Sequence, residues 1–320
     1  MMKKVLITAP YMIREKKTVE DLFKRKNVKL DWAKVKERLE EKDLLKIIKE
    51  YNGIICGDDR ITKRVLSEAV NLEVIVKWGT GIDSIDKEEA ERRGIPVFRT
   101  PNAFSDPVGD TTVGGILAFA RNIFTSDRLM KRGEWDKPIS YCLSEKTVGI
   151  IGLGNTGTAV AKRLSIFGPI ILANDIVEKD TEIIRRYGIK MVSKDELYKK
   201  ADFICLHCDL NKTSFHLLNE VAFKKMKKRP YVINMARGPI IDEAALINAL
   251  KSGKIAGAGL DVFEEEPLPK DSPLRKMDNV ILSSHNANSS PYYWQKVHKN
   301  SVKMLLEGLG IEKNSPDNRC

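Results

Sequence analysis

The stretch VGIIGLGNTG, residues 148–157, decides the fold. Apolar residues alternate with glycines in it, so we expect a buried strand to run directly into a tight glycine turn. The next residues, TAVAKRLSIF (158–167), place their apolar side chains on one face of a helix. Gly152 permits the turn, Gly154 lets the backbone approach a pyrophosphate, and Gly157 lets the helix pack on the strand. The pattern therefore predicts a dinucleotide-binding turn.

An acidic residue at the right distance supports this prediction. The run PIILAND (169–175) has the pattern of a second buried strand and ends in Asp175, 18 residues after Gly157. At this spacing a carboxylate meets the ribose hydroxyls of the adenosine, which favours NAD over NADP. No Arg or Lys follows before Lys179. In the alternative interpretation, Asp175 only caps the next helix.

Composition limits the possible classes of protein. The chain has 320 residues, of which 42% are apolar, and this predicts two domains of α/β type. It contains no apolar run long enough to span a membrane. The net charge of +11 is spread along the chain and mixed with acidic residues, so we expect a solvated surface and no nucleic-acid partner.

The cysteines predict a reducing, cytoplasmic location and no metal site. Their number is odd, and they are scattered along the chain, at positions 56, 142, 205, 208 and 320. Cys205, His207 and Cys208 fall in or just after an apparent strand, where alternation sends neighbouring side chains to opposite faces. They therefore do not form an expected metal-ligand set.

Strand and helix signals alternate along the whole chain. The first hundred residues give the apolar runs KKVLITA, NVKL, GIICG, LEVIVKW and IPVF, with helical patterns between them. A boundary is expected at TPNAF (100–104), and the helical pattern from Pro291 onward is expected to return to the first domain. We predict two doubly wound parallel-sheet domains with a cleft between them: residues 1–103 plus 292–320, and residues 104–291.

Three expected strand ends carry reactive side chains. VINMARG (232–238) ends at Arg237, AGAGLDVFEEEP (256–267) leads to Glu266, and VILSSHNANSS (280–290) contains His285. In open parallel sheets, ligands bind beyond the carboxyl ends of the strands, so these side chains are expected to converge. Arginine can bind a carboxylate through paired hydrogen bonds, histidine can move a proton near neutral pH, and a carboxylate can fix the tautomer of that histidine.

Alternatives remain for each of these three residues. Arg237 could form a surface ion pair, and His285 could be an ordinary loop histidine. Glu264 or Glu265 could be the true partner of His285. The remaining histidines, at positions 207, 216 and 298, are weaker candidates from their sequence surroundings.

Taken together, these motifs resemble the D-isomer-specific 2-hydroxyacid dehydrogenase family, especially its D-3-phosphoglycerate dehydrogenase-like branch. WGTGIDSID (78–86) resembles the family's substrate loop, NMARG (234–238) its arginine motif and GLDVFEEEP (259–267) its glutamate motif. The resemblance implies a flavodoxin-like substrate domain and a Rossmann NAD domain. It also implies a homodimer built largely by the cofactor domains.

The resemblance assigns roles by position. Arg237 would bind and polarise the substrate, His285 would act as the acid or base, and Glu266 would tune His285. Residues assigned to the cofactor are Gly152, Gly154, Asn155, Thr156, Gly157, Asp175, Thr80, Thr112, Cys208, Ala236 and Asp261. Residues assigned to the substrate are Trp78, Gly79 and Thr80 through their backbone amides, Asn102, and Lys77 as a candidate phosphate ligand.

The expected activity is NAD-dependent interconversion of a D-2-hydroxy acid and its 2-oxo acid. The small anionic substrate could be 3-phosphoglycerate, glyoxylate or hydroxypyruvate, and Lys77, with Arg60 as a second charge, would favour a phosphate. In the alternative interpretation, which is the more usual one for such a residue, Lys77 is a strand-end surface lysine. The alternative function is an NAD(H)-sensing, corepressor-like binding protein with little turnover. The arginine motif departs from the family at Pro239, where a second glycine is usual.

Overall fold

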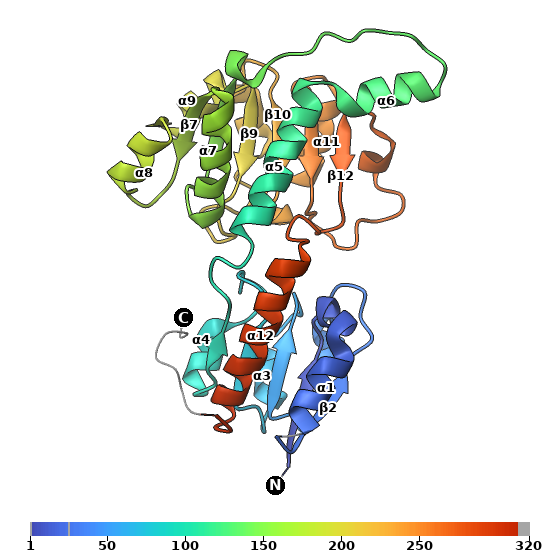
Figure 1. Ribbon diagram of the computed structural model, residues 1–320, viewed down its shortest axis with the longest axis vertical. Helices are drawn as coiled ribbons and strands as arrows, with labels where there is room; N and C mark the ends of the chain where they lie inside the picture. The colour runs from blue at the N-terminus through green and yellow to red at the C-terminus, as the bar shows by residue number, and fades with distance from the viewer. Residues whose placement is uncertain (1, 25, 313–320) are drawn as a thin grey trace. The chain divides into compact units, whose positions relative to one another are not determined.

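The computed structural model describes residues 2–24 and 26–312 (Figure 1). The chain divides into two compact units, Met1–Phe104 with Ser290–Cys320, and Ser105–Ser289. We call them the N-terminal unit and the central unit. Residues 313–320 of the expected first domain, including Cys320, lie outside the described residues.

The N-terminal unit is built on a five-stranded parallel sheet with the order β2-β1-β3-β4-β5. This is the flavodoxin-like order. Its strands are β1 (Lys3–Ile7), β2 (Val28–Trp32), β3 (Gly53–Cys56), β4 (Val74–Lys77) and β5 (Val97–Phe98). Its α-helices are α1 (Lys16–Lys24), α2 (Glu41–Leu44), α3 (Lys63–Glu68), α4 (Lys87–Arg92) and the long α12 (Pro291–Gly308), which packs on β3 and β4.

The central unit is built on a seven-stranded parallel sheet with the order β12-β11-β10-β9-β6-β7-β8. Strand β6 lies inside the sheet between β9 and β7, and the strand order reverses there, as in a Rossmann fold. The strands are β6 (Thr147–Ile151), β7 (Ile170–Asn174), β8 (Ile189–Met191), β9 (Phe203–Leu206), β10 (Tyr231–Asn234), β11 (Gly257–Leu260) and β12 (Val280–Leu282). The α-helices are α5 (Ser105–Ala120), α6 (Ile123–Lys131), α7 (Asn155–Phe167), α8 (Thr181–Arg186), α9 (Lys194–Lys200), α10 (Glu220–Lys225) and α11 (Glu243–Lys251).

Alternation along the strands builds a hydrophobic core on each face of both sheets. On β9, Phe203 and Cys205 belong to the core under α5 and α7, whereas Ile204 and Leu206 belong to the core under α9, α10 and α11. A strand buried on both faces shows a continuous apolar sequence, which is why FICL gives no period of two. Both faces of each sheet are therefore packed against a hydrophobic core, and the loops at the strand ends remain available for functional side chains.

Two helical features differ from the sequence expectation. The pattern over EEKDLLKIIKEY gives only the short α2 and a 3-10 turn at Ile48–Glu50, while α1 and α6 had no separate expectation. Among the described residues, no helix combines the length and the apolar character that a membrane span requires.

Candidate active site

The glycine turn in the central unit has the geometry of a dinucleotide cradle. Gly152 has φ of 92°, and a Cβ there would lie 2.4 Å from the backbone nitrogen of Cys208. A Cβ at Gly157 would lie 2.1 Å from the carbonyl oxygen of Gly152, so neither position accepts a side chain. Gly154, the residue before α7, has no atom within 4 Å of its Cβ position, so this backbone is open to a ligand. The N-terminus of a 13-residue helix behind such a turn fits a pyrophosphate.

Asp175 follows β7 beside this turn. Its Oδ2 accepts from the Leu153 amide at 2.7 Å and lies 3.0 Å from Lys179 Nζ, and its Oδ1 accepts from the Val177 amide at 2.9 Å. Burial alone would raise the pKa of Asp175, but the bonds from Val177 and Lys179 and from the turn bring it below the usual value. The next helix, α8, is capped by Asp180 instead. The capping alternative for Asp175 is therefore wrong for this helix.

The other predicted cofactor residues occupy different environments. Asn155 and Thr156 form the open first turn of α7, and Cys208 lies against the glycine turn. The Ala236 amide donates to the side chain of Asn234 at 3.1 Å. Thr112, in contrast, is completely buried in α5 and its hydroxyl donates to the Val108 carbonyl at 2.8 Å, a geometry that argues against cofactor contact.

The register of three neighbouring strands brings the predicted catalytic segments to one edge of the sheet. Asn234 of β10 pairs with Leu260 of β11, which pairs with Leu282 of β12. Arg237 and His285 each follow three residues after these paired positions. Because parallel strands end at the same edge, the arginine, glutamate and histidine segments all leave the sheet there.

His285 and Glu266 are in direct contact. His285 Nδ1 lies 3.0 Å from Glu266 Oε2, while Glu266 Oε1 accepts from the Phe263 amide at 2.9 Å. Of the three consecutive glutamates, Glu264 contacts His216 instead and Glu265 is exposed. The structure therefore distinguishes Glu266 as the partner of His285, an assignment that the sequence left open.

Asp261 holds the loop that presents His285. This carboxylate is 1% exposed; it accepts from the Asn286 amide at 2.8 Å, from the Ala287 amide at 2.9 Å and from the Ser283 hydroxyl. Its carbonyl accepts from the His285 amide at 2.7 Å, and His285 has φ of 50°. The sequence assigned Asp261 to the cofactor; this network shows in addition that it shapes the histidine loop.

Arg237 is placed by a close approach of two backbones. A Cβ at Gly238 would lie 1.9 Å from the carbonyl carbon and oxygen of Phe263, so only glycine fits there. The Asn234 side chain donates to the Arg237 carbonyl at 2.9 Å, and Arg237 Nη1 donates to the Ala236 carbonyl at 2.9 Å. The arginine turn is thereby packed against the segment that carries Glu266. Pro239 does not disturb it, because this residue lies in a short 3-10 helix at Gly238–Ile240.

In the N-terminal unit, the predicted substrate loop follows β4. The Trp78 amide donates to the Cys56 carbonyl at 2.8 Å as part of the sheet, so this amide is not available to a substrate. Gly79 has φ of 120°, and the Thr80 hydroxyl donates to the Thr100 carbonyl at 3.0 Å. The Trp78 indole donates to His298 Nδ1 at 2.8 Å, inside the core. Asn102 has φ of 56° in the turn before α5 and is exposed.

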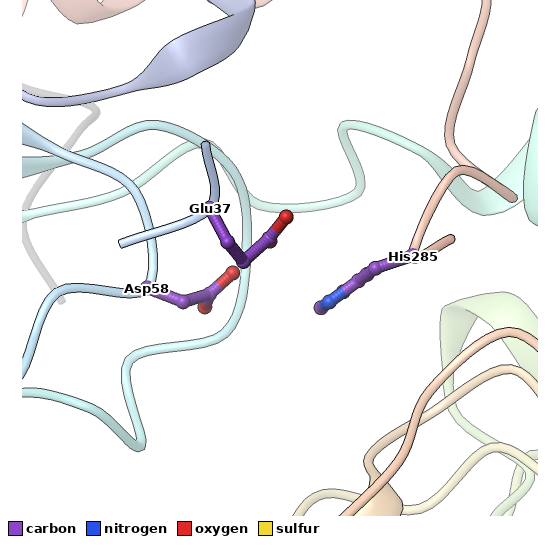
Figure 2. Close-up of side chains that lie close together, drawn as sticks. All are labelled: Glu37, Asp58 and His285. Atoms are coloured by element: carbon purple, nitrogen blue, oxygen red, sulfur yellow. The ribbon is translucent and has the colours of Figure 1, made fainter. Parts of the chain in front are cut away.

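The position of Lys77 argues against the predicted phosphate contact. The side chain is 3% exposed, and its Nζ donates to the Gly57 carbonyl at 2.6 Å and to Asp58 Oδ1 at 2.8 Å. An ammonium with two internal partners serves the structure of its own unit. Within this unit, the carboxylates of Glu37 and Asp58 lie close together, as Figure 2 shows, with one oxygen of each within 4.8 Å of the other. The alternative of a surface lysine is also wrong.

Sequence reasoning missed two features near these segments. Arg99 donates from Nη1 to the Thr80 carbonyl at 3.2 Å and so braces the predicted substrate loop. His207, at the end of β9, has both ring nitrogens buried without a hydrogen-bond partner, and burial lowers its pKa to about 4. Its position after a strand was visible in the sequence, but its burial was not.

Comparison with known proteins identifies the family. Residues 113–287, more than half of the chain, match the family described as D-isomer specific 2-hydroxyacid dehydrogenase, NAD binding domain. The chain belongs to this family. It is 42% identical to a glyoxylate reductase of Thermofilum pendens over 287 residues, which cover 87% of this chain and 83% of the relative. It is 37% identical to a hydroxypyruvate reductase of Thermotoga maritima, covering 86% and 90% of the two chains.

Solved structures agree with this assignment. D-Lactate dehydrogenase from Aquifex aeolicus, solved with NAD and lactic acid, superposes with a TM-score of 0.85 at 26% identity, covering 96% of this chain and 95% of the other. As a D-2-hydroxyacid dehydrogenase, the protein is an NAD-dependent oxidoreductase that interconverts 2-hydroxy and 2-oxo acids. The relatives named here are reductases and dehydrogenases, and they give no support to the corepressor-like alternative.

Proposed function

We propose that Arg237, Glu266 and His285 are the catalytic residues and that the preferred substrate is a small unphosphorylated 2-oxo acid. The 3.0 Å contact between His285 Nδ1 and Glu266 Oε2 is the main support, because it occurs on the strand edge that also carries Arg237. It orients the ring so that Nε2 can exchange a proton with the substrate oxygen.

The glycine turn and Asp175 would hold NADH, which when bound would supply the hydride for the carbonyl carbon of the 2-oxo acid. The guanidinium of Arg237 binds the substrate carboxylate and polarises the carbonyl. His285 Nε2 donates the proton that the new hydroxyl needs, and the Glu266 carboxylate stabilises the charged ring before this transfer. In the N-terminal unit, we assign binding of the substrate carboxylate to the amides of Gly79 and Thr80.

Two substitutions test the catalytic roles. His285→Asn should lower kcat by about a hundred- to ten thousandfold, because it removes the proton donor. Glu266→Gln keeps the size of the side chain but not its charge, and we expect a smaller loss of about tenfold to a hundredfold. Unchanged kcat in both variants, with correct folding, would refute the proposal.

The preference for an unphosphorylated substrate rests on the N-terminal unit. Lys77, the predicted phosphate ligand, is buried, and its ammonium donates to the Gly57 carbonyl and to Asp58, so it is already engaged within its own unit. Relatives named glyoxylate reductase and hydroxypyruvate reductase support the same choice. We expect kcat/KM for glyoxylate or hydroxypyruvate to exceed that for 3-phosphohydroxypyruvate. A preference for the phosphorylated acid would contradict this part of the proposal.

We also propose a homodimer formed through the central unit. Helix α6 and the connection after it (green in Figure 1) expose several large apolar side chains, among which Trp135 is 80% and Ile139 is 77% exposed. The others are Ile123, Phe124, Met130 and Tyr141. A surface of this kind is typical of a protein interface. Sedimentation should show a dimer, and Trp135→Asp with Ile139→Asp should give a monomer. A wild-type monomer at micromolar concentration would contradict the proposal.

A cytoplasmic location is the last part of the proposal. The four described cysteines, Cys56, Cys142, Cys205 and Cys208, are free thiols, as is usual in a reducing compartment. Fractionation of cells that produce the protein would test it, and recovery outside the cytoplasm would contradict it.

A further inference from the structure

His216 forms a second histidine–carboxylate contact in the central unit, outside the proposed catalytic set. Its Nε2 lies 2.5 Å from Glu264 Oε1. The neighbouring Phe215 ring stacks on the imidazole, with 4.0 Å between ring centroids and an angle of 13°. The side chains of His216 and Glu264 are each about one-third exposed (34% and 36%), so the pair lies at the surface. Neither side chain is needed for a hydrophobic core.

The backbone of His216 is tied to the arginine segment. Its amide donates to the Pro239 carbonyl at 2.9 Å, two residues after Arg237. Two residues later, the Leu218 amide donates to the Ile240 carbonyl at 3.1 Å. The Asn219 side chain donates to the His216 carbonyl at 3.1 Å and fixes the same turn. The position of the ring is therefore set relative to the segment that carries Arg237.

The side chain of His216 is tied to the glutamate segment. Glu264 directly follows Phe263, whose amide donates to Glu266 Oε1, and Glu266 Oε2 contacts His285. The Glu264 amide donates to Glu243 Oε2 at 3.3 Å, and the backbone of Gly238 touches that of Phe263. A continuous set of contacts thus links His216 to the pair formed by Glu266 and His285.

We propose that His216 is a positioning residue: through Glu264 it holds the Phe263–Glu266 segment in register with the Arg237 turn, and so keeps Glu266 on His285. The inference rests on the proposed catalytic role of these residues. His216 has φ of 47°, a conformation that costs a histidine energy and that glycine adopts freely. The contacts of the ring with Glu264 and Phe215 therefore accompany a backbone conformation that would suit glycine better.

The backbone conformation allows activity and stability to be separated. His216→Gly deletes the ring and removes the backbone strain, so the midpoint of thermal unfolding should stay equal or rise. The kcat for 2-oxo acid reduction should fall by about fivefold, the size expected from losing one solvent-accessible hydrogen bond. The KM for NADH should not change. A loss of kcat that accompanies a matching loss of stability would show a merely structural role and overturn the proposal.

Three matched variants sharpen this test. His216→Gln retains a donor for Glu264 and should recover most of the kcat that His216→Gly loses. Glu264→Ala should equal His216→Gly, and the double variant should be no worse than either one. Glu265→Ala, at the exposed neighbouring glutamate, should behave as wild type. Additive losses in the double variant, or no loss in His216→Gly, would refute the proposal.

A spectroscopic readout avoids dependence on turnover. The chain contains four histidines, so nitrogen NMR of protein labelled at histidine can resolve the His285 ring. In His216→Gly, the His285 nitrogen shifts should move toward those of Glu266→Gln, and in Glu265→Ala they should not move. Unchanged His285 signals in His216→Gly would overturn the inference. If His285→Asn and Glu266→Gln were themselves fully active, the proposed catalytic roles would fail instead, which is a distinguishable result.

Discussion

Lowering the pH from 7.5 to 5.0 should destabilise the central unit through one buried side chain, His207. Both of its ring nitrogens are buried without a hydrogen-bond partner, although the residue as a whole is partly exposed. Burial lowers the pKa of His207 from 6.5 to about 4. Between these two values the unfolded chain binds a proton that the folded unit does not bind, so stability falls as the pH falls.

The size of the effect follows from this window. With a pKa of 6.5 in the unfolded chain and about 4 in the folded one, the free energy of unfolding should drop by about 2 kcal/mol between pH 7.5 and pH 5.0. The stabilisation is complete above pH 6.5 and is lost progressively down to about pH 4. A drop of this size is a substantial fraction of the free energy of unfolding of a typical domain, which is about 5–15 kcal/mol.

Hydrogen exchange of the β6 and β9 amides, corrected for intrinsic rates, measures the stability of this unit without global unfolding. His207→Gln provides the control, since glutamine does not titrate in this range. The pH-dependent loss in the wild type should exceed that in the variant by about 2 kcal/mol. Equal pH dependence in the two proteins would show that the imidazole is not buried in its neutral form.

Three further predictions concern the proposed site. Gly238→Ala should abolish most activity and destabilise the central unit by more than about 3 kcal/mol, because a Cβ would lie 1.9 Å from the Phe263 carbonyl. Gly114→Ala on α5, where the space around the residue is open, should instead stabilise the unit by up to about 1 kcal/mol. Denaturant unfolding measures both changes, and equal effects would contradict the packing argument. Asp261→Asn should lower kcat by at least about tenfold, because an amide cannot accept all the hydrogen bonds that shape the His285 loop. Ser283→Ala removes only one of these bonds and should lower kcat less. Steady-state kinetics compares the two losses of kcat, and a larger loss in Ser283→Ala would refute the prediction. Asp175→Ala should raise the KM for NADH by about tenfold and that for NADPH by less; a larger effect on NADPH would contradict the ribose assignment.

The sequence predicts those features that local patterns determine. The glycine turn and the strands before Asp175, Arg237 and His285 are visible because each short apolar run ends at a glycine or polar residue. Parallel strands share one loop edge, so the order of strands and loops along the chain is enough to predict that the reactive segments converge.

Features that depend on distant partners could not be predicted. Lys77 is charged and ends a strand, but its burial depends on the loop of Asp58, which lies 19 residues earlier in the chain. The contact between His216 and Glu264 spans 48 residues, and no local pattern indicates it. The choice of Glu266 among three consecutive glutamates depends on the turn that returns its carboxylate to the Phe263 amide. Such pairings are properties of the assembled loops.

The role of Arg237 is tested most directly by measuring the reduction of a 2-oxo acid by Arg237→Ala, with NADH binding measured on the same protein by fluorescence. In this variant, kcat/KM for glyoxylate or hydroxypyruvate should fall by about a hundred- to a thousandfold, while the NADH dissociation constant and the melting temperature stay close to wild type. Near-normal reduction by a folded Arg237→Ala protein would contradict the claim that this guanidinium, together with His285 and Glu266, acts on the reacting carbonyl.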